Sequence, residues 1–582
     1  MIFKLLIISA FLAKINSLPC PSRCTCSLDS KDRKVVACVK GGMTGSVNLD
    51  GITLETQIIK ISAPEDNLND LQMSPIFQSY KKLEEIHITR SNIPQLGLHF
   101  FWGLTKLEVL NLSQNNITQA LPNNFRGLDR LKELYLDDNR IHSLPSSSFQ
   151  FLKELRLLSI QRNRLTTLVI SLFHNINKLR VLKLSGNQLG ELNPEVFGDI
   201  KELRVLECRN CGLHKLDPAV NKQLYQLTHL DLGENEIKSI LNEDIRGLQS
   251  LKNLKLDGNQ IRALSDSTFV HQSQMGKLNL AHNEIARISA NAFQDLHNFS
   301  ELNLSHNKLE SLENGSLSPI ANTLEVLVLS GNHIKLNTLQ DLLTIRLKEL
   351  HLSHCDIADI HLQIFPDSLN VLDLSHNRLS DLPIEVIPSN LTTLDISRNM
   401  FRGLNEEILL VLDNVRKIKL DKNPWSCDLC HIVPLLEKSN KTGAYRDVVC
   451  MYPYTMSNKK LANVERSELT WCTAASYNSG DANFFFLGED GRVGIVAASM
   501  SVCLLFLTVL VIIGALCYSR RHAAKYYTHE DKLAKEGESI LENNHSPLFC
   551  DRELTFSFPG DKKISISTID EIKKEHAITN GT

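Results

Sequence analysis

One repeated pattern in the sequence limits what the chain can fold into. It reads L-x-x-L-x-L-x-x-N-x-L, with isoleucine sometimes replacing leucine, and recurs at 24-residue steps in LEVLNLSQNNI, LKELYLDDNRI, LRLLSIQRNRL and LRVLKLSGNQL. Residues two apart on a strand point to the same side, so the alternating leucines would line one face of a short strand. One copy cannot bury that face alone, so folding requires that successive copies stack into a solenoid.

A polar residue, usually asparagine, follows each strand at the same point of the repeat. Its amide can bond backbone groups of adjacent coils that burial would otherwise leave unpaired, and we call this point the ladder position. Steps between copies are mostly 24 residues and range from 22 to 25 toward the C-terminal end. The sequence places the ladder at residues 92, 115, 139, 163, 187, 211, 235, 259, 283, 307, 332, 355, 377, 399 and 423, with a degenerate earlier turn ending at Asn67.

Many copies also carry a phenylalanine ten residues after the ladder position. Such a column would stack as an aromatic spine on the convex side of the solenoid. Its members are Phe125, Phe149, Phe173, Phe197, Phe269, Phe293 and Phe365. With strands about 4.8 Å apart, fifteen coils would form an arc about 70 Å long.

The repeats resemble the leucine-rich repeat family over residues 50–425. The resemblance implies an α/β solenoid of about 15–16 repeats, with short parallel strands on the concave face, irregular or 3₁₀ backs and disulfide-bonded caps. A solenoid without caps would expose its last apolar layer. The layout is also similar to extracellular leucine-rich-repeat single-pass transmembrane proteins of invertebrates.

Eight of the 14 cysteines form one group before the repeats and one after them. The later group contains a Cys-x-x-Cys pair, Cys427 and Cys430, whose spacing in a cytosolic enzyme would indicate a zinc or redox site. An oxidising lumen favours disulfides, and zinc stays the alternative. Three pairings are open for each group. The resemblance implies Cys20–Cys26, Cys24–Cys38, Cys427–Cys450 and Cys430–Cys472, although two residues rather than the family's usual one separate the first two cysteines of the later group.

Three further cysteines lie within the repeats. Cys211 and Cys355 occupy ladder positions, and Cys208 replaces an inward-facing leucine. A reactive or metal-binding trio is one interpretation. We favour the other, in which all three are small buried hydrophobic residues.

The two ends of the chain predict membrane topology. Residues 1–17 have an early Lys4, an apolar run and then small residues, which is typical of a secretory signal peptide. Residues 493–517 contain no charge, and a helix of that length would span about 37 Å, enough to cross a bilayer. Arg520, Arg521 and Lys525 follow this run, so the C-terminal side is expected in the cytoplasm. We therefore expect a type I single-pass protein of the plasma membrane with an extracellular N-terminus.

The resulting domain organisation has seven parts. The stalk is too short for an immunoglobulin or fibronectin module, and the polar tail is too short for a kinase and is expected to be disordered. The predicted boundaries are signal peptide 1–17, N-terminal cap 18–50, repeats 51–422, C-terminal cap 423–473, stalk 474–492, membrane helix 493–517 and tail 518–582.

Seven Asn-x-Ser/Thr sequences on the lumenal side predict glycosylation. Two of them fall between strand leucines and would place sugar on the concave face. The seven are Asn111, Asn116, Asn298, Asn303, Asn314, Asn390 and Asn440.

The concave strand face is the expected binding surface. Its outward positions near the N-terminal end include Val109, Leu157, Val181 and Val205, with Tyr135 beside them. One hypothesis is that these five residues form an apolar docking patch bounded by a glycan on Asn111. The other is that valine stands there only because it favours strands.

The function expected from these features is non-enzymatic. The sequence contains no Gly-rich phosphate loop, no His-Glu-x-x-His and no G-x-S-x-G, so no cofactor or metal is expected, and a near-neutral net charge of −3 indicates no nucleic-acid partner. The resemblance implies recognition of an extracellular protein or matrix component in adhesion, epithelial or matrix organisation during development. The alternative is a receptor or co-receptor that signals through its short tail to an intracellular adaptor.

Overall fold

The computed structural model of the protein describes residues 20–47, 51–73, 75–360, 365–442 and 445–472. The chain divides into two compact units, Met1–Ala474 and Ala475–Thr582, and all described residues belong to the first. The predicted signal peptide, stalk, membrane span and tail lie outside the described residues. None of the helices within the described ranges has both the length and the apolar character that crossing a bilayer requires.

An eighteen-stranded sheet runs through the coils. β1 is antiparallel to β2, and from β2 onward each coil adds one strand parallel to the last. The strands are β1 (Thr25–Leu28), β2 (Lys34–Cys38), β4 (Ile58–Ile61), β6 (Glu85–Ile88), β7 (Val109–Asn111), β8 (Glu133–Tyr135), β9 (Leu157–Ser159), β10 (Val181–Lys183), β11 (Val205–Glu207), β12 (His229–Asp231), β13 (Asn253–Lys255), β15 (Lys277–Asn279), β17 (Glu301–Asn303), β18 (Val326–Val328), β19 (Glu349–His351), β20 (Val371–Asp373), β21 (Thr393–Asp395) and β22 (Lys417–Lys419).

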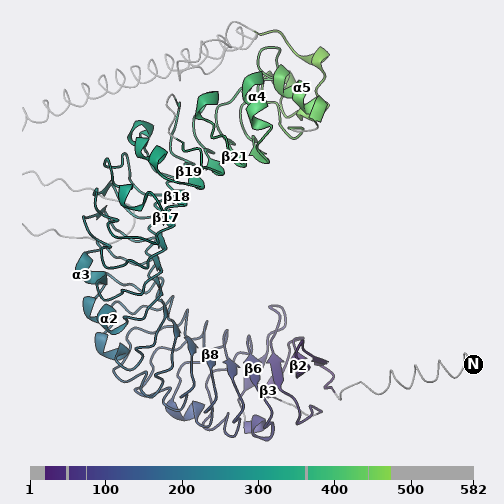
Figure 1. Ribbon diagram of the computed structural model, residues 1–582. Helices are drawn as coiled ribbons and strands as arrows, with labels where there is room; N and C mark the ends of the chain where they lie inside the picture. The colour runs from purple at the N-terminus through teal and green to yellow at the C-terminus, as the bar shows by residue number, and fades with distance from the viewer. Residues whose placement is uncertain (1–19, 48–50, 74, 361–364, 443–444, 473–582) are drawn as a thin grey trace, which may run out of the picture. The chain divides into compact units, whose positions relative to one another are not determined.

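The backs of the coils are short and varied. Figure 1 shows the sheet on the inner side of the curved array, with α2 and α3 on its outer side. Two small parallel pairs add to the backs, β3 (Thr44–Ser46) with β5 (Asp70–Gln72) and β14 (Ala263–Leu264) with β16 (Arg287–Ile288). The α-helices are α2 (Pro218–Gln223), α3 (Asn242–Ile245), α4 (Glu406–Leu412) and α5 (Val433–Thr442). The 3₁₀ helices are η1 (Pro75–Ser79), η2 (Pro122–Phe125), η3 (Pro194–Phe197), η4 (Ser318–Ile320), η5 (Leu336–Thr338), η6 (Gln340–Thr344), η7 (Ile384–Val386), η8 (Tyr454–Met456), η9 (Leu461–Asn463) and η10 (Arg466–Glu468).

The leucines of the repeat form one continuous core. The central strand leucines Leu110, Leu134, Leu158 and Leu182 are each fully buried, and burying one such side chain contributes about 1.5–3 kcal/mol. Because a coil contacts only its neighbours, this energy is distributed along the array rather than concentrated in one centre. The predicted solenoid with a concave parallel sheet is thus confirmed.

The ladder asparagines join each coil to the one before it. Asn163 donates its amide N–H to the carbonyl oxygens of Leu136 at 2.9 Å and Ile160 at 3.3 Å, and its Oδ1 accepts from the backbone N–H of Ile141 at 2.9 Å. The same bonds recur at the later asparagines, for example at Asn187. The predicted role of this position is confirmed.

The first two assigned ladder positions were wrong. Ser91 rather than Asn92 fills the ladder, because its buried backbone N–H donates to Asn115 Oδ1 at 3.0 Å while Asn92 is exposed. In the preceding coil Asn69 takes the place expected for Asn67, and it donates to Ser91 Oγ at 3.1 Å. Counting 24 residues back from Asn115 reaches Ser91, so the repeat length was the better guide than residue type.

The aromatic spine exists but is interrupted. Ring centroids lie 5.8 Å apart for Phe125 and Phe149, 6.5 Å for Phe173 and Phe197 and 6.2 Å for Phe269 and Phe293. Two coils between Phe197 and Phe269 place Asn221 and Ile245 at this position, in α2 and α3. The α-helical backs α2 and α3 therefore occur where the phenylalanine is missing.

Both ends of the array are capped as predicted. At the N-terminal end the antiparallel strand β1 covers β2, with disulfides Cys20–Cys26 and Cys24–Cys38. At the other end the buried Trp425 stacks 6.5 Å from Phe401 and donates its indole N–H to the Leu420 carbonyl at 3.0 Å. An aromatic ring thus covers the last apolar layer where the next coil would otherwise sit.

Candidate protein-binding surface

The inner sheet face carries outward side chains in straight columns. Parallel register places Val109 beside Glu133, then Leu157, Val181 and Val205 in succession. Each aliphatic member of this column is partly exposed. Leu157, Val181 and Val205 are therefore contiguous, and we call these three residues the aliphatic run.

Val109 and Tyr135, the other two residues of the predicted patch, are separated from the aliphatic run. Glu133 stands between Val109 and Leu157, and the Tyr135 hydroxyl donates to Glu133 Oε2 at 2.8 Å. Burial and this hydrogen bond raise the pKa of Tyr135 to about 12. Tyr135 therefore stays protonated at neutral pH and adds a hydroxyl-tipped aromatic to the edge of the run.

Charged groups lie alongside the aliphatic run, at the ends of β10 and β11 and in the turn that follows β11. Lys183 pairs with Glu207 at 2.9 Å. Arg209 contacts Asp257 at 2.6 Å and Glu234 at 3.1 Å. An apolar centre with a charged rim is the usual anatomy of a protein–protein contact site.

The C-terminal part of the same face has different chemistry. Small hydroxyl side chains fill one column over five coils, and Ser330 and Ser353 are hydrogen-bonded through their Oγ atoms at 2.9 Å. The column consists of Ser305, Ser330, Ser353, Ser375 and Ser397. All of these serines except Ser353 are buried, and Ser305 and Ser397 donate their hydroxyls to Asn303 and Asp395, so the column supplies no apolar anchor.

Stacked histidines lie beside this serine column, a feature the sequence analysis did not assign. His282 and His306 stack with ring centroids 4.3 Å apart, and His354 and His376 with centroids 3.8 Å apart. All four have positive φ near 55° immediately before the ladder position, a conformation in which histidine is enriched. The recurring LAHN and LSHN segments were the available signal.

Two of these imidazoles have a lowered pKa. Burial and the proximity of His282 and His354 lower the pKa of His306. Burial, His354 and Arg398 lower the pKa of His376. Both rings are therefore neutral at pH 7, which suits stacking.

The predicted glycosylation sites differ in exposure. Asn298, Asn314, Asn390 and Asn440 are exposed, whereas Asn111, Asn116 and Asn303 are partly buried. Asn111 and Asn303 lie on the inner face, as predicted, and their Oδ1 atoms accept from the backbone N–H of Ser113 and Ser305. Occupancy of all seven stays a prediction.

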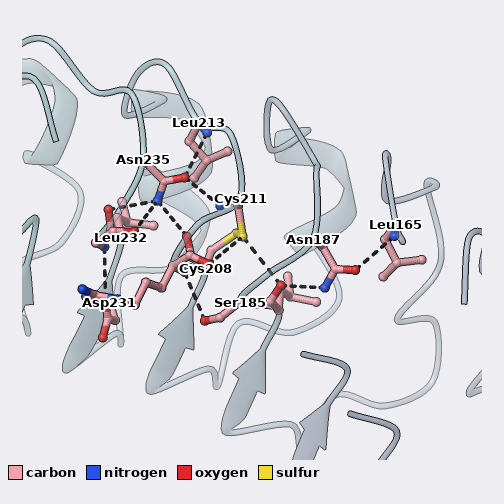
Figure 2. The surroundings of a disulfide bond; sticks show 12 residues. Leu165, Ser185, Asn187, Cys208, Cys211, Leu213, Asp231, Leu232 and Asn235 are labelled. Atoms are coloured by element: carbon pink, nitrogen blue, oxygen red, sulfur yellow. Dashed lines mark hydrogen bonds and ion pairs between the residues drawn. A yellow bond between two sulfur atoms is a disulfide. The ribbon is translucent and has the colours of Figure 1, made fainter. Parts of the chain in front are cut away.

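The cysteines within the repeats require a correction. Cys208 and Cys211 form a disulfide, with Cα atoms 5.6 Å apart, whereas we had treated them as separate buried hydrophobic residues. The turn after β11 folds the ladder position back over the last inward side chain, which brings the two sulfurs together (Figure 2). Cys355 is buried outside any disulfide, as expected, and burial raises the pKa of its thiol.

This disulfide replaces one rung of the ladder. Asn187 and Asn235 flank it in the neighbouring coils (Figure 2). Asn235 still accepts from the backbone N–H of Cys211 at 2.9 Å and donates to the Cys208 carbonyl at 2.8 Å. Cys211 Sγ lies 3.6 Å from the Leu184 carbonyl oxygen but, being disulfide-bonded, has no proton to donate. In this coil a covalent bond therefore replaces the hydrogen bonds that an asparagine side chain makes in other coils.

A small cavity lies beside the same coil. Its volume is about 110 Å³, and Leu206, Leu213, Leu216 and Leu230 are among the lining residues. Asn221, which replaces the spine phenylalanine, also lines it. The smaller side chain leaves room that a ring fills in the neighbouring coils.

The C-terminal cap holds its Cys-x-x-Cys pair in disulfides. The bonds are Cys427–Cys450 and Cys430–Cys472, the pairing that the family resemblance implied. Asp428, Cys430 and Cys472 form a potential metal-ligand group by proximity. However, the two sulfurs are bonded to each other and offer no thiolate.

Asp428 has a structural role in this cap. Its carboxylate accepts from Ser426 Oγ at 2.6 Å, the Cys430 N–H at 2.9 Å and His431 Nδ1 at 2.8 Å. Burial opposes ionisation, but these bonds hold the pKa of Asp428 below its ordinary value. The extra residue between the cap cysteines is thus part of a hydrogen-bonded turn.

Comparisons with known proteins agree with this architecture. Leucine rich repeat families match residues 81–141, 129–189, 153–211, 201–261, 249–309 and 273–334, with further matches at 347–360 and 368–389. No curated protein sequence matches the chain. A leucine-rich-repeat protein of Leptospira interrogans is similar in structure at 24% identity, with 65% of this chain and 93% of that chain covered and a TM-score of 0.54.

Two further complexes are similar at lower scores. The ectodomain of the Arabidopsis thaliana receptor kinase GASSHO1/SCHENGEN3, in complex with CASPARIAN STRIP INTEGRITY FACTOR 2, is 20% identical over 70% of this chain and 51% of that chain (TM-score 0.44). The Drosophila Toll–Spatzle complex is 17% identical over 72% and 85% (TM-score 0.32). Sequence matches, ladder geometry and the Leptospira fold together identify the repeat region of this chain as a leucine-rich-repeat solenoid.

Proposed function

We propose that this chain is a non-enzymatic cell-surface protein that binds an extracellular protein or matrix component through its inner sheet face. The observation that carries the proposal is the aliphatic run: Leu157, Val181 and Val205 are contiguous, partly exposed and held on paired strands. A rigid apolar centre needs little ordering when it binds, so more of its contact energy appears as affinity. Val109 and Tyr135 extend the contact toward the N-terminal cap.

The biological setting that we propose is adhesion or matrix organisation at the plasma membrane. It rests on the predicted signal peptide and membrane span, which lie outside the described residues, and on the similarity of layout to invertebrate transmembrane proteins of this family. The alternative is signalling through the tail, and an experiment has to distinguish it from adhesion or matrix organisation by the ectodomain. Neither setting requires a catalytic group.

The test of the binding surface uses two matched substitutions on full-length protein displayed by cells. Val181→Lys places a charge in the aliphatic run, whereas Val371→Lys makes the same change in the same column between Glu349 and Thr393. We expect V181K to weaken adhesion to matrix or neighbouring cells by on the order of 2 kcal/mol, about thirtyfold in affinity. V371K should bind normally at equal surface level, measured by biotinylation. Normal adhesion by V181K would overturn the proposed surface.

A truncation after Lys525 tests the setting. Rescue of a loss-of-function animal or cell by this variant would assign the function to the ectodomain and its anchor. Failure at normal surface level would assign output to residues 526–582 and favour the receptor alternative.

A further inference from the structure

Exposed aromatic and apolar side chains gather on the C-terminal cap. Trp471 is 84% exposed, Tyr454 94% and Tyr452 47%, with Met451 about as exposed as Tyr452. Apolar side chains at such exposure usually have a partner when they cluster. Of the other two tryptophans, Trp425 is buried in the same cap, and Trp102, which is 43% exposed, lies between β6 and β7 with Arg126 over its ring.

The backbone of the cap brings these residues together. The N–H groups of Cys427 and Leu429 donate to the carbonyls of Tyr452 at 2.7 Å and Thr470 at 3.1 Å. Residues two apart on an extended segment direct their N–H groups to the same edge, so the segments at 452 and 470 lie along one edge about 7 Å apart. The two disulfides of the cap also fasten them, at Cys450 and Cys472. The backbone segments that carry Tyr452 and Trp471 are therefore held close together by hydrogen bonds and disulfides.

The chain that follows indicates what covers this surface. The charge-free run that begins at Val493 starts only 20 residues after Thr473. A connection of that length reaches at most about 70 Å when fully extended. A cap tethered so closely to a bilayer needs only weak affinity to rest on it, because docking becomes intramolecular.

We propose that Tyr452, Tyr454 and Trp471 dock the C-terminal cap into the headgroup region of the lipid bilayer that anchors the chain. Tyrosine and tryptophan carry an apolar ring with one polar atom, and this combination favours the membrane–water interface. Lys459, paired with Glu468, and Lys460, paired with Asp447, leave the cap without a large excess charge. Docking thus relies on the aromatic rings rather than on anionic lipid. The inference rests on the proposed membrane anchoring of this chain.

The experiment uses full-length protein in phosphatidylcholine nanodiscs with either brominated or ordinary acyl chains. Bromine quenches only tryptophans close to the acyl region, and the chain has three tryptophans. We expect brominated lipid to quench part of the fluorescence, and we expect that part to disappear in W471F but persist in W102F. The double variant Y452S/Y454S should lose most of the quenching while retaining Trp471. Its control is Y225S, at a tyrosine elsewhere that is about as exposed as Tyr452.

The outcomes separate this inference from the proposed anchoring. Protein that enters nanodiscs without quenching of Trp471 would overturn the docking and leave the anchoring in place; the aromatic cluster would then face a protein partner. Protein that does not enter nanodiscs at all would overturn both. Quenching that Y452S/Y454S leaves unchanged would also overturn the proposed surface.

Discussion

Two regions of the inner face share the repeat but present different side chains. From β9 to β11 the outward column is uninterrupted and aliphatic, whereas from β18 to β21 the same column reads Val326, Glu349, Val371 and Thr393, and stacked histidines follow the strands. Buried leucines occupy the central inward position of the strands in both regions. The repeat therefore leaves the outward positions free to vary, and they distinguish an uninterrupted aliphatic run from a region where a charged side chain and histidines accompany isolated valines.

The largest effect should come from the ladder that both regions share. Replacing Asn163 by Ala removes the hydrogen-bond partner of three buried backbone groups, the carbonyls of Leu136 and Ile160 and the N–H of Ile141. Leaving these groups unpaired should lower the free energy of unfolding by about 3 kcal/mol. In the serine–histidine region Cys355 holds the ladder position, and Cys355→Ala should cost only about 1 kcal/mol because little more than one sulfur is lost. Hydrogen exchange of the adjoining coils measures both. Equal losses would mean that the ladder amides contribute no more than ordinary packing.

The Cys208–Cys211 disulfide lies just beyond the aliphatic run and gives the next largest effect. Closing so short a loop should contribute about 2 kcal/mol, so C208A/C211A should lower the free energy of unfolding by at least that amount. C208L/C211N restores the repeat pattern and should recover it, since an amide could bond the Leu184 carbonyl that the disulfide sulfur cannot. Denaturant unfolding under oxidising conditions compares the two. If C208L/C211N is no more stable than C208A/C211A, this coil cannot accept the standard rung.

Shortening single side chains to alanine tests whether partner binding differs between the two regions. Leu157→Ala should weaken partner binding by on the order of 1–2 kcal/mol, roughly tenfold in Kd, because a central apolar contact is lost. Val326→Ala, at the same column position near the serines, should leave Kd unchanged. Titration of the displayed ectodomain against the partner gives both values. Similar losses would place the contact along the whole face rather than on the aliphatic run.

How much of this could be read from sequence depends on whether a position faces inward or outward. The leucine period predicted the sheet and most of the ladder, because burial dictates those positions, and the two cysteine groups with the family resemblance predicted the caps. The leucine period did not predict the Cys208–Cys211 bond, since only the turn after β11 brings those sulfurs together. The histidine stacks were also missed, because the positive φ before each ladder residue, which aligns the rings, is a property of the coil rather than of the residue type.

The smallest expected effect is a pH dependence confined to the histidine region. The folded-state pKa values of His306 and His376 are lowered, so the unfolded chain binds more protons, and their contribution to stability is present above about pH 6.5 and lost as the pH falls through the folded-state values. The groups facing them are His282 and His354 for His306, and His354, Arg398, Asp373 and Asp395 for His376. His351 acts in the opposite sense, since Asp373 raises its pKa, and its contribution is lost as the pH rises.

Region-resolved hydrogen exchange at pH 7.5 and 5.5 decides which histidines dominate the pH dependence of stability. Exchange should accelerate at pH 5.5 in coils 282–376 more than in coils 109–211, after correction for intrinsic rates. His306→Gln with His376→Gln should reduce that difference, because a neutral amide replaces the ring that would be protonated. His351→Gln, the matched control, should enlarge it by removing the pair that strengthens in acid. A uniform response along the array would show that the stacked rings do not couple neighbouring coils, and that the two regions differ only in what they present to a partner.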